Sequence, residues 1–181
     1  MERLNYPNRA ILAIAPHDHL QGVIDAPTTL IEYGDYQCPY CAQMHKMIQT
    51  IQHQLNPQFC FVFRHFPQSQ FHFQAQKAAE AAEAAAAQGQ FWQMHNLLFE
   101  RQKFLNDGNL LEYANELGLD LYEFLGAIAQ RQYADRVAQD ISSGIQGGVA
   151  CTPTLFINGS RYNDAWEVER LSTAIQNQEA Q

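Results

Sequence analysis

Two cysteines separated by two residues give this sequence its clearest chemical signal. Cys38 and Cys41 enclose Pro39 and Tyr40 in a C-x-x-C arrangement. Such a pair either exchanges disulfide bonds or supplies half of a zinc site. A structural zinc site needs a second C-x-x-C or a pair of histidines at matching spacing, and the sequence contains neither. The redox interpretation is therefore favoured, and the elements around the pair must decide it.

The flanking residues place Cys38 where a strand meets a helix. Residues 29–33 form a β-branched and apolar run that predicts a buried strand, and residues 42–55 carry apolar side chains at helical spacing. Pro39 suits the first helical position, where its missing N–H is not needed. A thiolate at a helix N-terminus faces unpaired N–H groups, so the pKa of Cys38 should fall below the free value of about 8.5. Cys41, one turn further in, should be more buried and resolve the mixed disulfide.

An acidic residue lies inside the apolar strand that precedes the pair. Glu32 stands six residues before Cys38, and strand alternation could simply place it on a solvated face. Alternatively, Glu32 is a buried carboxylate beneath the dithiol, with a raised pKa that lets it move the proton of Cys41. The sequence alone leaves both interpretations open.

The other cysteines and the histidines carry weaker signals. Cys60 lies inside an aromatic strand and is predicted to be a core residue. Cys151 is interpreted either as a small, partly buried filler or as an additional redox thiol or metal ligand. His45, one turn after Cys41, could touch the site electrostatically. His17 and His19 could bind metal, but isolated histidines on a polar arm usually do not. Structural or loop roles are predicted for His65 and His72.

Composition and charge exclude several classes of function. The chain has 181 residues, with 11 basic and 19 acidic side chains and a formal charge of −8. An acidic chain without a basic run or a Gly-rich phosphate loop is not expected to bind nucleic acid or an anionic membrane surface. No apolar run approaches the roughly 18 residues that span a membrane. Residues 10–15 form an apolar stretch too short for a signal peptide, so we expect a cytoplasmic protein with this stretch as its first strand or arm.

The order of the predicted elements indicates an α/β fold interrupted by helices. Strands are predicted at residues 29–33, 59–63, 154–157 and 161–162, and the final helix at 166–176. Between residues 74 and 147 the pattern predicts helices alone. They comprise an Ala-rich helix at 74–88, a helix whose core includes Phe91, Trp92 and Met94, a helix at 110–117, one capped by Asp120 with Glu123, and a last helix with Tyr133, Val137, Ile141 and Ile145 as a buried stripe.

Together these motifs resemble those of the DsbA family of thioredoxin-fold proteins, and in particular bacterial DsbA-like domains, some of which are fused to sodium/proton antiporters. The resemblance covers roughly residues 17–175. It rests on Glu32 to Cys41, Arg64-His65-Phe66-Pro67, Phe91-Trp92 before Met94-His95, and Thr152-Pro153-Thr154 before Phe156-Ile157-Asn158-Gly159. It implies a thioredoxin fold, a mixed β-sheet flanked by helices, with an all-helical insertion. The implied division is an N-terminal arm or strand at 1–27, the thioredoxin-fold domain at 28–73 and 148–181, and the helical insertion at 74–147.

The resemblance also implies roles for individual residues. Cys38 would attack, Cys41 would resolve and Glu32 would be the buried acid, with Pro39 and Tyr40 completing the catalytic motif. Pro153 would be cis and lie against the dithiol, and Thr152 would offer backbone hydrogen bonds to an extended substrate, with Cys151 beside them. This chain departs from the family in two places. Strongly oxidising members have His where Tyr40 stands, so Cys38 should be less acidic and its disulfide less oxidising. Relatives often have a small residue such as Gly in place of Cys151.

The sequence thus predicts a protein-disulfide oxidoreductase that needs no metal and no cofactor besides the Cys38–Cys41 disulfide. Its partners would be protein thiols or disulfides, or glutathione-like small thiols, together with a recycling reductase or oxidase. Two alternatives stay open: a glutathione-dependent reductase or transferase, and a non-enzymatic metal or iron–sulfur binder that uses Cys38, Cys41 and Cys151. No motif encodes the direction of exchange, the physiological substrate or the oligomeric state.

Overall fold

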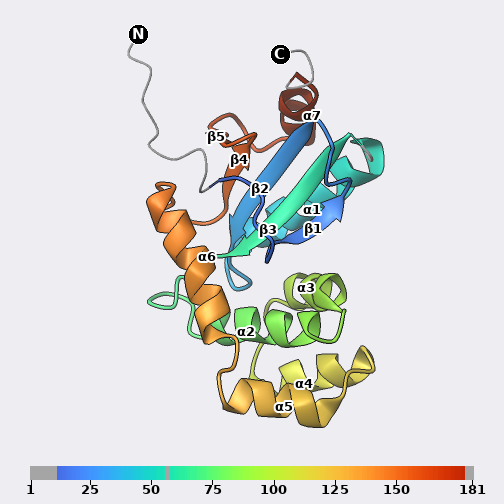
Figure 1. Ribbon diagram of the computed structural model, residues 1–181, viewed down its shortest axis with the longest axis vertical. Coiled ribbons are helices and arrows are strands. Elements are labelled where there is room, and N and C mark those ends of the chain that lie inside the picture. Colours follow the sequence, from blue (N-terminus) through green and yellow to red (C-terminus); the bar gives the residue numbers. More distant parts are fainter. Residues whose placement is uncertain (1–11, 56–57, 178–181) are drawn as a thin grey trace.

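A computed structural model describes residues 12–55 and 58–177 of the chain. Its sheet has the strand order β1-β3-β2-β4-β5 (Figure 1). β2 and β3 run parallel, whereas β1 with β3, β2 with β4 and β4 with β5 are antiparallel. The strands are β1 (His19–Gly22), β2 (Thr28–Gly34), β3 (Phe59–His65), β4 (Thr154–Ile157) and β5 (Ser160–Arg161).

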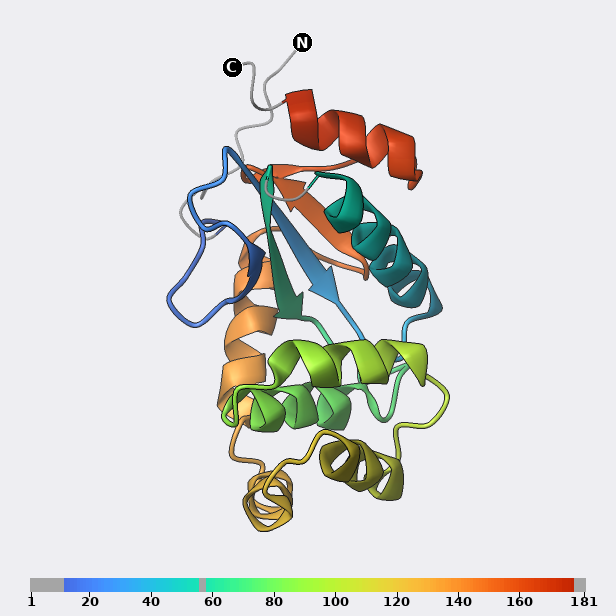
Figure 2. The ribbon, with the colours of Figure 1, turned by 90° about the vertical axis from the view of Figure 1, so that its right-hand side faces the viewer.

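Helices cover both faces of this sheet. α1 (Pro39–Leu55) and α7 (Val168–Gln176) lie on one face, and α6 (Ala134–Gln146) lies on the other (Figure 2). The helices between β3 and α6 stack beyond the end of the sheet (Figure 1). They are α2 (Ala75–Ala86), α3 (Phe91–Glu100), α4 (Asp107–Glu116) and α5 (Leu121–Ala129). The predicted α/β architecture, a mixed sheet flanked by helices with an inserted helical part, is therefore confirmed.

Alternation along β2 divides the core into two layers. Leu30 belongs to the cluster that packs under α1, whereas Ile31 and Tyr33 belong to the cluster on the α6 side. All three are fully buried, and each such side chain contributes about 1.5–3 kcal/mol through burial. Because side chains in a strand alternate between faces, Glu32 shares the α1 face with Leu30. The strand thus directs its one carboxylate toward the helix that begins at the dithiol.

The first strand differs from the prediction. The predicted strand or arm at residues 10–15 lies partly outside the described residues, and its described part, from Leu12, is not a strand. β1 instead begins at His19 and pairs with the edge of β3. Its sequence, His-Leu-Gln-Gly, carries one apolar residue. An edge strand held mainly by backbone hydrogen bonds leaves little hydrophobic signal, which explains why the sequence did not locate β1.

The predicted stripe on α6 is only partly correct. Val137 is fully buried, but Ile145 is 62% exposed. A spacing of four residues drifts by about 40° per step around a helix with 3.6 residues per turn, so Ile145 leaves the buried face. Gly144 occupies the contact instead, because a Cβ atom there would lie 2.8 Å from the Phe66 ring.

Side-chain caps explain where α4 and α5 begin, and a turn explains where β4 ends. The Asp120 side chain accepts a hydrogen bond from the Glu123 amide at 2.9 Å, as predicted for the start of α5. Asn106 caps α4 in the same way, which starts that helix three residues earlier than predicted. Asn158 and Gly159 have φ angles of 47° and 77° and form the predicted hairpin turn between β4 and β5. β5 is Ser160–Arg161, one residue earlier than predicted, and α7 starts two residues later, at Val168.

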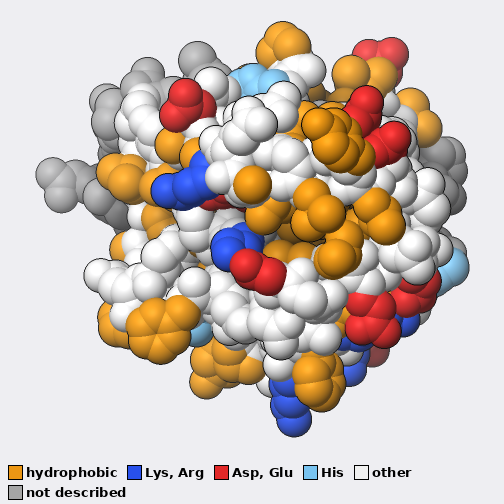
Figure 3. Space-filling view, turned by 90° about the horizontal axis from the view of Figure 1, so that it is seen from below, with side chains coloured by type: hydrophobic (Ala, Val, Ile, Leu, Met, Phe, Trp, Pro, Cys, Tyr) orange, Lys and Arg blue, Asp and Glu red, His pale blue; other side chains and the backbone are white. Residues whose placement is uncertain are grey.

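Within the described ranges, no helix is both long and apolar enough to cross a membrane. At the end of the helical part farthest from the sheet, apolar side chains gather in a hollow (Figure 3). Leu110, Leu125 and Ile128 help to line this cavity of about 390 Å³. None of the residues around the dithiol lines it.

Candidate active site

The two cysteines of the motif lie at the start of α1, at the strand-to-helix junction predicted from the sequence. Both are free thiols, and their exposed fractions are 4% for Cys38 and 0% for Cys41. The Cys38 amide donates to the Asp35 carbonyl at 3.1 Å. The Asp35 amide in turn donates to Sγ of Cys41 at 3.4 Å. Residue 35 therefore contacts both halves of the dithiol through its backbone.

The environment of Cys38 favours its thiolate. Its pKa is lowered to about 6, chiefly because the Cys41 thiol donates a hydrogen bond to it. Burial opposes this shift, while the backbone amides of Cys41 and Tyr40 add to it. These amides belong to the first turn of α1, where N–H groups lack partners within the helix. The helix N-terminus thus lowers the pKa of Cys38 as predicted, but the hydrogen bond from Cys41 lowers it more.

The pKa of Cys41 moves in the opposite direction. Burial raises it well above the ordinary thiol value. The hydrogen bond that Cys41 donates to Cys38 and the negative charge of Glu32 raise it further. The Asp35 amide is the contact that lowers it. The motif therefore contains one thiol ready to ionise beside one held protonated.

Glu32 lies on the α1 face of the sheet and is 1% exposed, so the solvated-face alternative is wrong. Its pKa is raised to about 8, first by burial and then by the negative charge of Cys38. Its Oε1 atom has no hydrogen-bond partner among the described residues. A buried carboxyl with one unpaired oxygen and a pKa near neutrality is suited to taking up and releasing a proton.

The segment before β4 lies against the dithiol. The peptide bond between Thr152 and Pro153 is cis, as the resemblance implied. The Cys38 thiol contacts the carbonyl of Thr152 at 3.4 Å. Cys151 is exposed, so its interpretation as a partly buried filler is wrong. Beside this segment, a cavity of about 430 Å³ is lined by residues 66–70 together with Val149 and Ala150.

Sequence reasoning missed the side chains that fix the dithiol turn. Gln102, in the helical part, donates from Nε2 to the carbonyls of Tyr36 and Cys38, both at 2.8 Å. Its distance along the chain leaves no sequence signal. The carboxylate of Asp35 is also buried, and a short acidic side chain directly after a strand is the one signal that could have suggested it.

Exposed aromatic side chains occur on the motif and on segments that contact it. Pro39 and Tyr40 are exposed, and the Tyr40 ring contacts Trp166 with centroids 6.2 Å apart. Both of these rings are accessible, at 57% and 43% of their surface. Phe71, in the loop after β3, and Phe104, two residues beyond Gln102, are exposed as well. The exposed part of the motif therefore carries an accessible aromatic pair, Tyr40 and Trp166.

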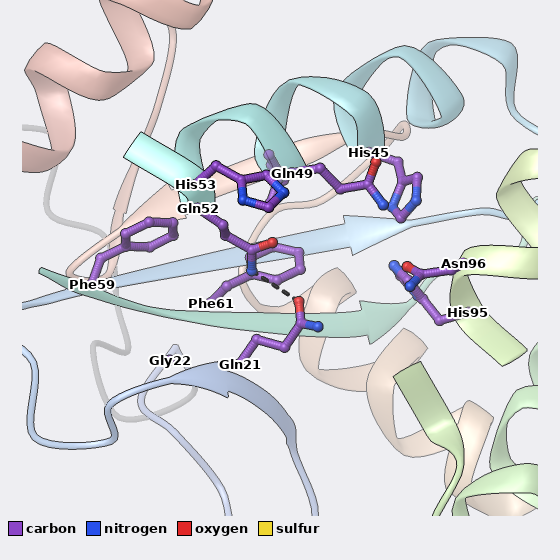
Figure 4. A pocket seen from close by; sticks show the side chains of 11 residues that line it. Gln21, Gly22, His45, Gln49, Gln52, His53, Phe59, Phe61, His95 and Asn96 are labelled. Atoms are coloured by element: carbon purple, nitrogen blue, oxygen red, sulfur yellow. Dashed lines mark hydrogen bonds between the residues drawn. The ribbon is translucent and has the colours of Figure 1, made fainter. Parts of the chain in front are cut away.

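His45 faces a separate cavity of about 460 Å³, between α1, α3 and β1 (Figure 4). Its ring lies 5.1 Å from that of His95, and Gln52 donates to Gln21 across the same cavity at 2.8 Å. Burial lowers the pKa of His45 to about 4. His45 is consequently neutral at pH 7, and it supplies no positive charge to the dithiol.

The described residues contain two groups of converging metal-ligand atoms, and neither includes a cysteine. In one, His19 and His65 both hydrogen-bond to Oε1 of Glu83 at 2.9 Å. The Arg136 guanidinium lies 3.7 Å from that oxygen and opposes a cation there. The other group comprises His17, Asp18 and Asp140. Cys60 is fully buried, as expected of a core residue, and His72 hydrogen-bonds to Asp35.

Comparison with known proteins starts from the sequence. A family model described as thioredoxin matches residues 15–177. Among curated relatives, a Na(+)/H(+) antiporter NhaA 3 of Salinispora tropica is 43% identical over 158 residues, which cover 87% of this chain and 24% of the relative. A Na(+)/H(+) antiporter NhaA 1 of Mycolicibacterium gilvum is 36% identical, over 88% of this chain and 26% of the relative. The chain thus spans about a quarter of the length of these relatives.

Solved structures confirm the predicted fold. A thioredoxin-like oxidoreductase from Silicibacter pomeroyi superposes with a TM-score of 0.85 at 24% identity, covering 97% of this chain and 99% of the other. BdbD from Bacillus subtilis gives 0.82 at 22% identity, with 90% and 92% covered. Wolbachia pipientis α-DsbA1 also gives 0.82 at 22%, with 95% and 96% covered. The predicted likeness to DsbA-type proteins therefore holds over nearly the whole chain.

Proposed function

Because this chain belongs to the thioredoxin family, we propose that it is a protein-disulfide oxidoreductase. The observation that carries the proposal is that the pKa values of the two thiols shift in opposite directions. The pKa of Cys38 is lowered to about 6, while that of Cys41 is raised. A thiolate attacks disulfides and a thiol does not, so the order of reaction is built into the site.

In the reducing direction, Cys38 reacts first. Its thiolate attacks one sulfur of a substrate disulfide, a new S–S bond forms to Cys38, and the second substrate sulfur leaves as a thiolate. This step removes the negative charge of Cys38. That charge is one of the two causes that raise the pKa of Glu32. The pKa of Glu32 therefore falls once the mixed disulfide has formed, and Glu32 becomes able to lose its proton.

Cys41 then resolves the mixed disulfide. Glu32 in its carboxylate form takes the proton of Cys41, and the resulting thiolate attacks Sγ of Cys38. The Cys38–Cys41 bond forms, the bond to the substrate breaks, and the substrate sulfur leaves with the electron pair. The dithiol has then lost two electrons and the substrate disulfide has gained them. The oxidising direction is the same sequence reversed.

The surroundings of Cys38 favour polypeptides over glutathione as substrates. The exposed rings of Tyr40 and Trp166 contact each other beside the nucleophile. An extended chain is proposed to lie along Thr152 and the neighbouring cavity. Glutathione is a small anion, and no lysine or arginine of the described residues is among the hydrogen-bond partners of Cys38 and Cys41. The proposed partners are therefore protein thiols or disulfides and a recycling reductase or oxidase.

The proposed exchange uses the disulfide itself and no further cofactor. A cytoplasmic setting, in which most thiols stay reduced, would make the protein a reductase fed by cellular reductants. We propose this setting from the sequence, and the reduction potential tests it.

The test is exchange with a disulfide-bonded protein, such as insulin, followed by mass spectrometry. Cys38→Ser should abolish exchange, and Cys41→Ser should accumulate mixed disulfides at residue 38. Full activity of Cys38→Ser would refute the proposal. Turnover that requires glutathione would favour the glutathione-dependent alternative. Stoichiometric metal in anaerobically purified protein would favour the metal or iron–sulfur binder, although no converging ligand group in the described residues contains a cysteine.

A further inference from the structure

The buried carboxylate of Asp35 has no part in the steps above, yet it lies directly behind the dithiol. It is 1% exposed. Oδ1 accepts a hydrogen bond from the Gln37 amide at 2.7 Å. Oδ2 accepts one from the Gln68 amide at 2.8 Å and one from Nδ1 of His72 at 2.7 Å. Three donors from two separate segments therefore fix one side chain, an arrangement that leaves Asp35 little freedom to turn.

The backbone of the same residue contacts the resolving thiol. The Asp35 amide donates to Sγ of Cys41 at 3.4 Å. For Cys41 to attack, its sulfur must become a thiolate inside the core, where burial disfavours charge. The Asp35 amide is a donor already aimed at that sulfur. A rotation of this peptide would remove it at the moment when the negative charge develops.

We propose that Asp35 is a positioning residue for the resolving step, and that its side chain holds its own amide on Cys41 through the loop after β3. This inference rests on the proposed exchange activity and deepens it. The loop comprises residues 66–74, and Gln68 and His72 are its contacts with Asp35. Gln68 also contacts the segment before β4, because its Nε2 donates to the carbonyl of Ala150 at 3.3 Å.

Cys38 does not depend on the Asp35 side chain in the same way. Its thiolate is stabilised by Cys41 and by the amides of the first turn of α1. Its carbonyl is held by Gln102 at 2.8 Å. Loosening Asp35 should therefore slow the second chemical step and leave the first one intact. This split distinguishes positioning of Cys41 from general damage to the fold.

Asp35→Asn is the sharpest perturbation. The carboxylate accepts hydrogen bonds from two backbone amides, those of Gln37 and Gln68, whereas an asparagine side chain has one oxygen and one NH₂ group. Whichever way the amide is turned, its NH₂ group faces a backbone N–H and one buried bond is lost. The substitution thus breaks the anchor without changing the volume of the side chain.

The assay is the stopped-flow reaction of the reduced protein with dithiobis(nitrobenzoate). All proteins carry Cys151→Ser, because the exposed Cys151 thiol would also react with the reagent. The first nitrothiobenzoate released reports attack by Cys38, and the second reports resolution by Cys41. Asp35→Asn should slow the second release about tenfold, the effect of losing one hydrogen bond to a charged group. The first release should stay within about twofold of the reference protein, since the Asp35 side chain is not among the groups that lower the pKa of Cys38.

A matched variant completes the design. Asp107→Asn makes the same charge change at a side chain that is 74% exposed and should alter neither step. Should Asp35→Asn not fold, His72→Phe removes one of the three donors and should slow resolution about threefold.

The outcomes separate the two proposals. If the reference protein releases no second equivalent, the exchange function itself fails. If the reference releases both and folded Asp35→Asn releases the second at the same rate, Asp35 does not position Cys41. Equal slowing of both steps would also overturn the inference, because it would indicate distortion of the whole site.

Discussion

The Cys41→Ala substitution tests the main cause of the acidity of Cys38. In the native site, the pKa of Cys38 is lowered to about 6, and the hydrogen bond from the Cys41 thiol is the largest contribution. A hydrogen bond to a charged group contributes about 1.5–3 kcal/mol, and one pKa unit corresponds to about 1.36 kcal/mol. The lower end applies, because an S–H group is a weaker hydrogen-bond donor than an N–H or O–H group. We therefore expect the pKa to rise by about one unit.

The rate of alkylation by iodoacetamide as a function of pH measures this shift. At pH 6, a rise of about one unit reduces the thiolate fraction from about one half to about one tenth, so alkylation should slow about fivefold. Cys41→Ser keeps an O–H donor at the same place and should retain a midpoint near that of the native pair. All proteins in the series carry Cys151→Ser, so that only residue 38 reacts. An unchanged midpoint in Cys41→Ala would show that the helix amides, and not Cys41, set the acidity.

Three further predictions follow from particular side chains. Because burial raises the pKa of Glu32 from 4.5 to about 8, the folded state holds this proton more tightly than the unfolded state, and stability falls as pH rises through that window. Glu32→Gln should remove this loss and raise the free energy of unfolding at pH 7 by roughly 3 kcal/mol, which denaturant titration measures. It should also slow resolution by Cys41 about 100-fold in the two-step release assay. A resolution rate equal to that of the native protein would exclude Glu32 as the base. Gly144→Ala should cost about 1–3 kcal/mol of stability, since the new Cβ would meet Phe66 at 2.8 Å. Gly126→Ala on α5, where a Cβ would meet none of the described residues within 4 Å apart from its own helix, should instead stabilise the protein by about 0.5–1 kcal/mol. Equal effects of the two substitutions in thermal unfolding would contradict the close contact between Gly144 and Phe66. Trp166→Ala should lower kcat/KM for an unfolded disulfide-bonded protein by about tenfold, a typical loss for an exposed aromatic contact, and leave reduction of glutathione disulfide unchanged; a loss with both substrates would argue against a polypeptide site.

The reactive centre could be predicted because its signals are local. A strand, a proline at the first helical position and two cysteines one turn apart lie within a dozen residues, and each constrains the next. The position of Glu32 required the structure, because alternation alone did not say which face of the sheet is covered. The structure shows that α1 covers that face and buries the carboxylate.

The supports of the site could not be predicted in the same way. Gln102 and His72 contact the dithiol turn from the helical part and from the loop after β3, and nothing in a single sequence reports which distant polar side chains meet. The edge strand β1 was missed for a related reason. Its pairing with β3 uses backbone groups, and those groups are the same whatever the residue type.

The reduction potential of the Cys38–Cys41 pair is the most direct test of disulfide exchange by this protein. It is obtained by equilibration in glutathione buffers, alkylation and mass spectrometry. The pKa of Cys38, at about 6, lies between about 7 for thioredoxin and about 3.5 for DsbA. The potential should therefore lie between about −270 and −120 mV, and closer to the thioredoxin end. If no disulfide forms between Cys38 and Cys41 at any ratio of reduced to oxidised glutathione, the proposed function is wrong.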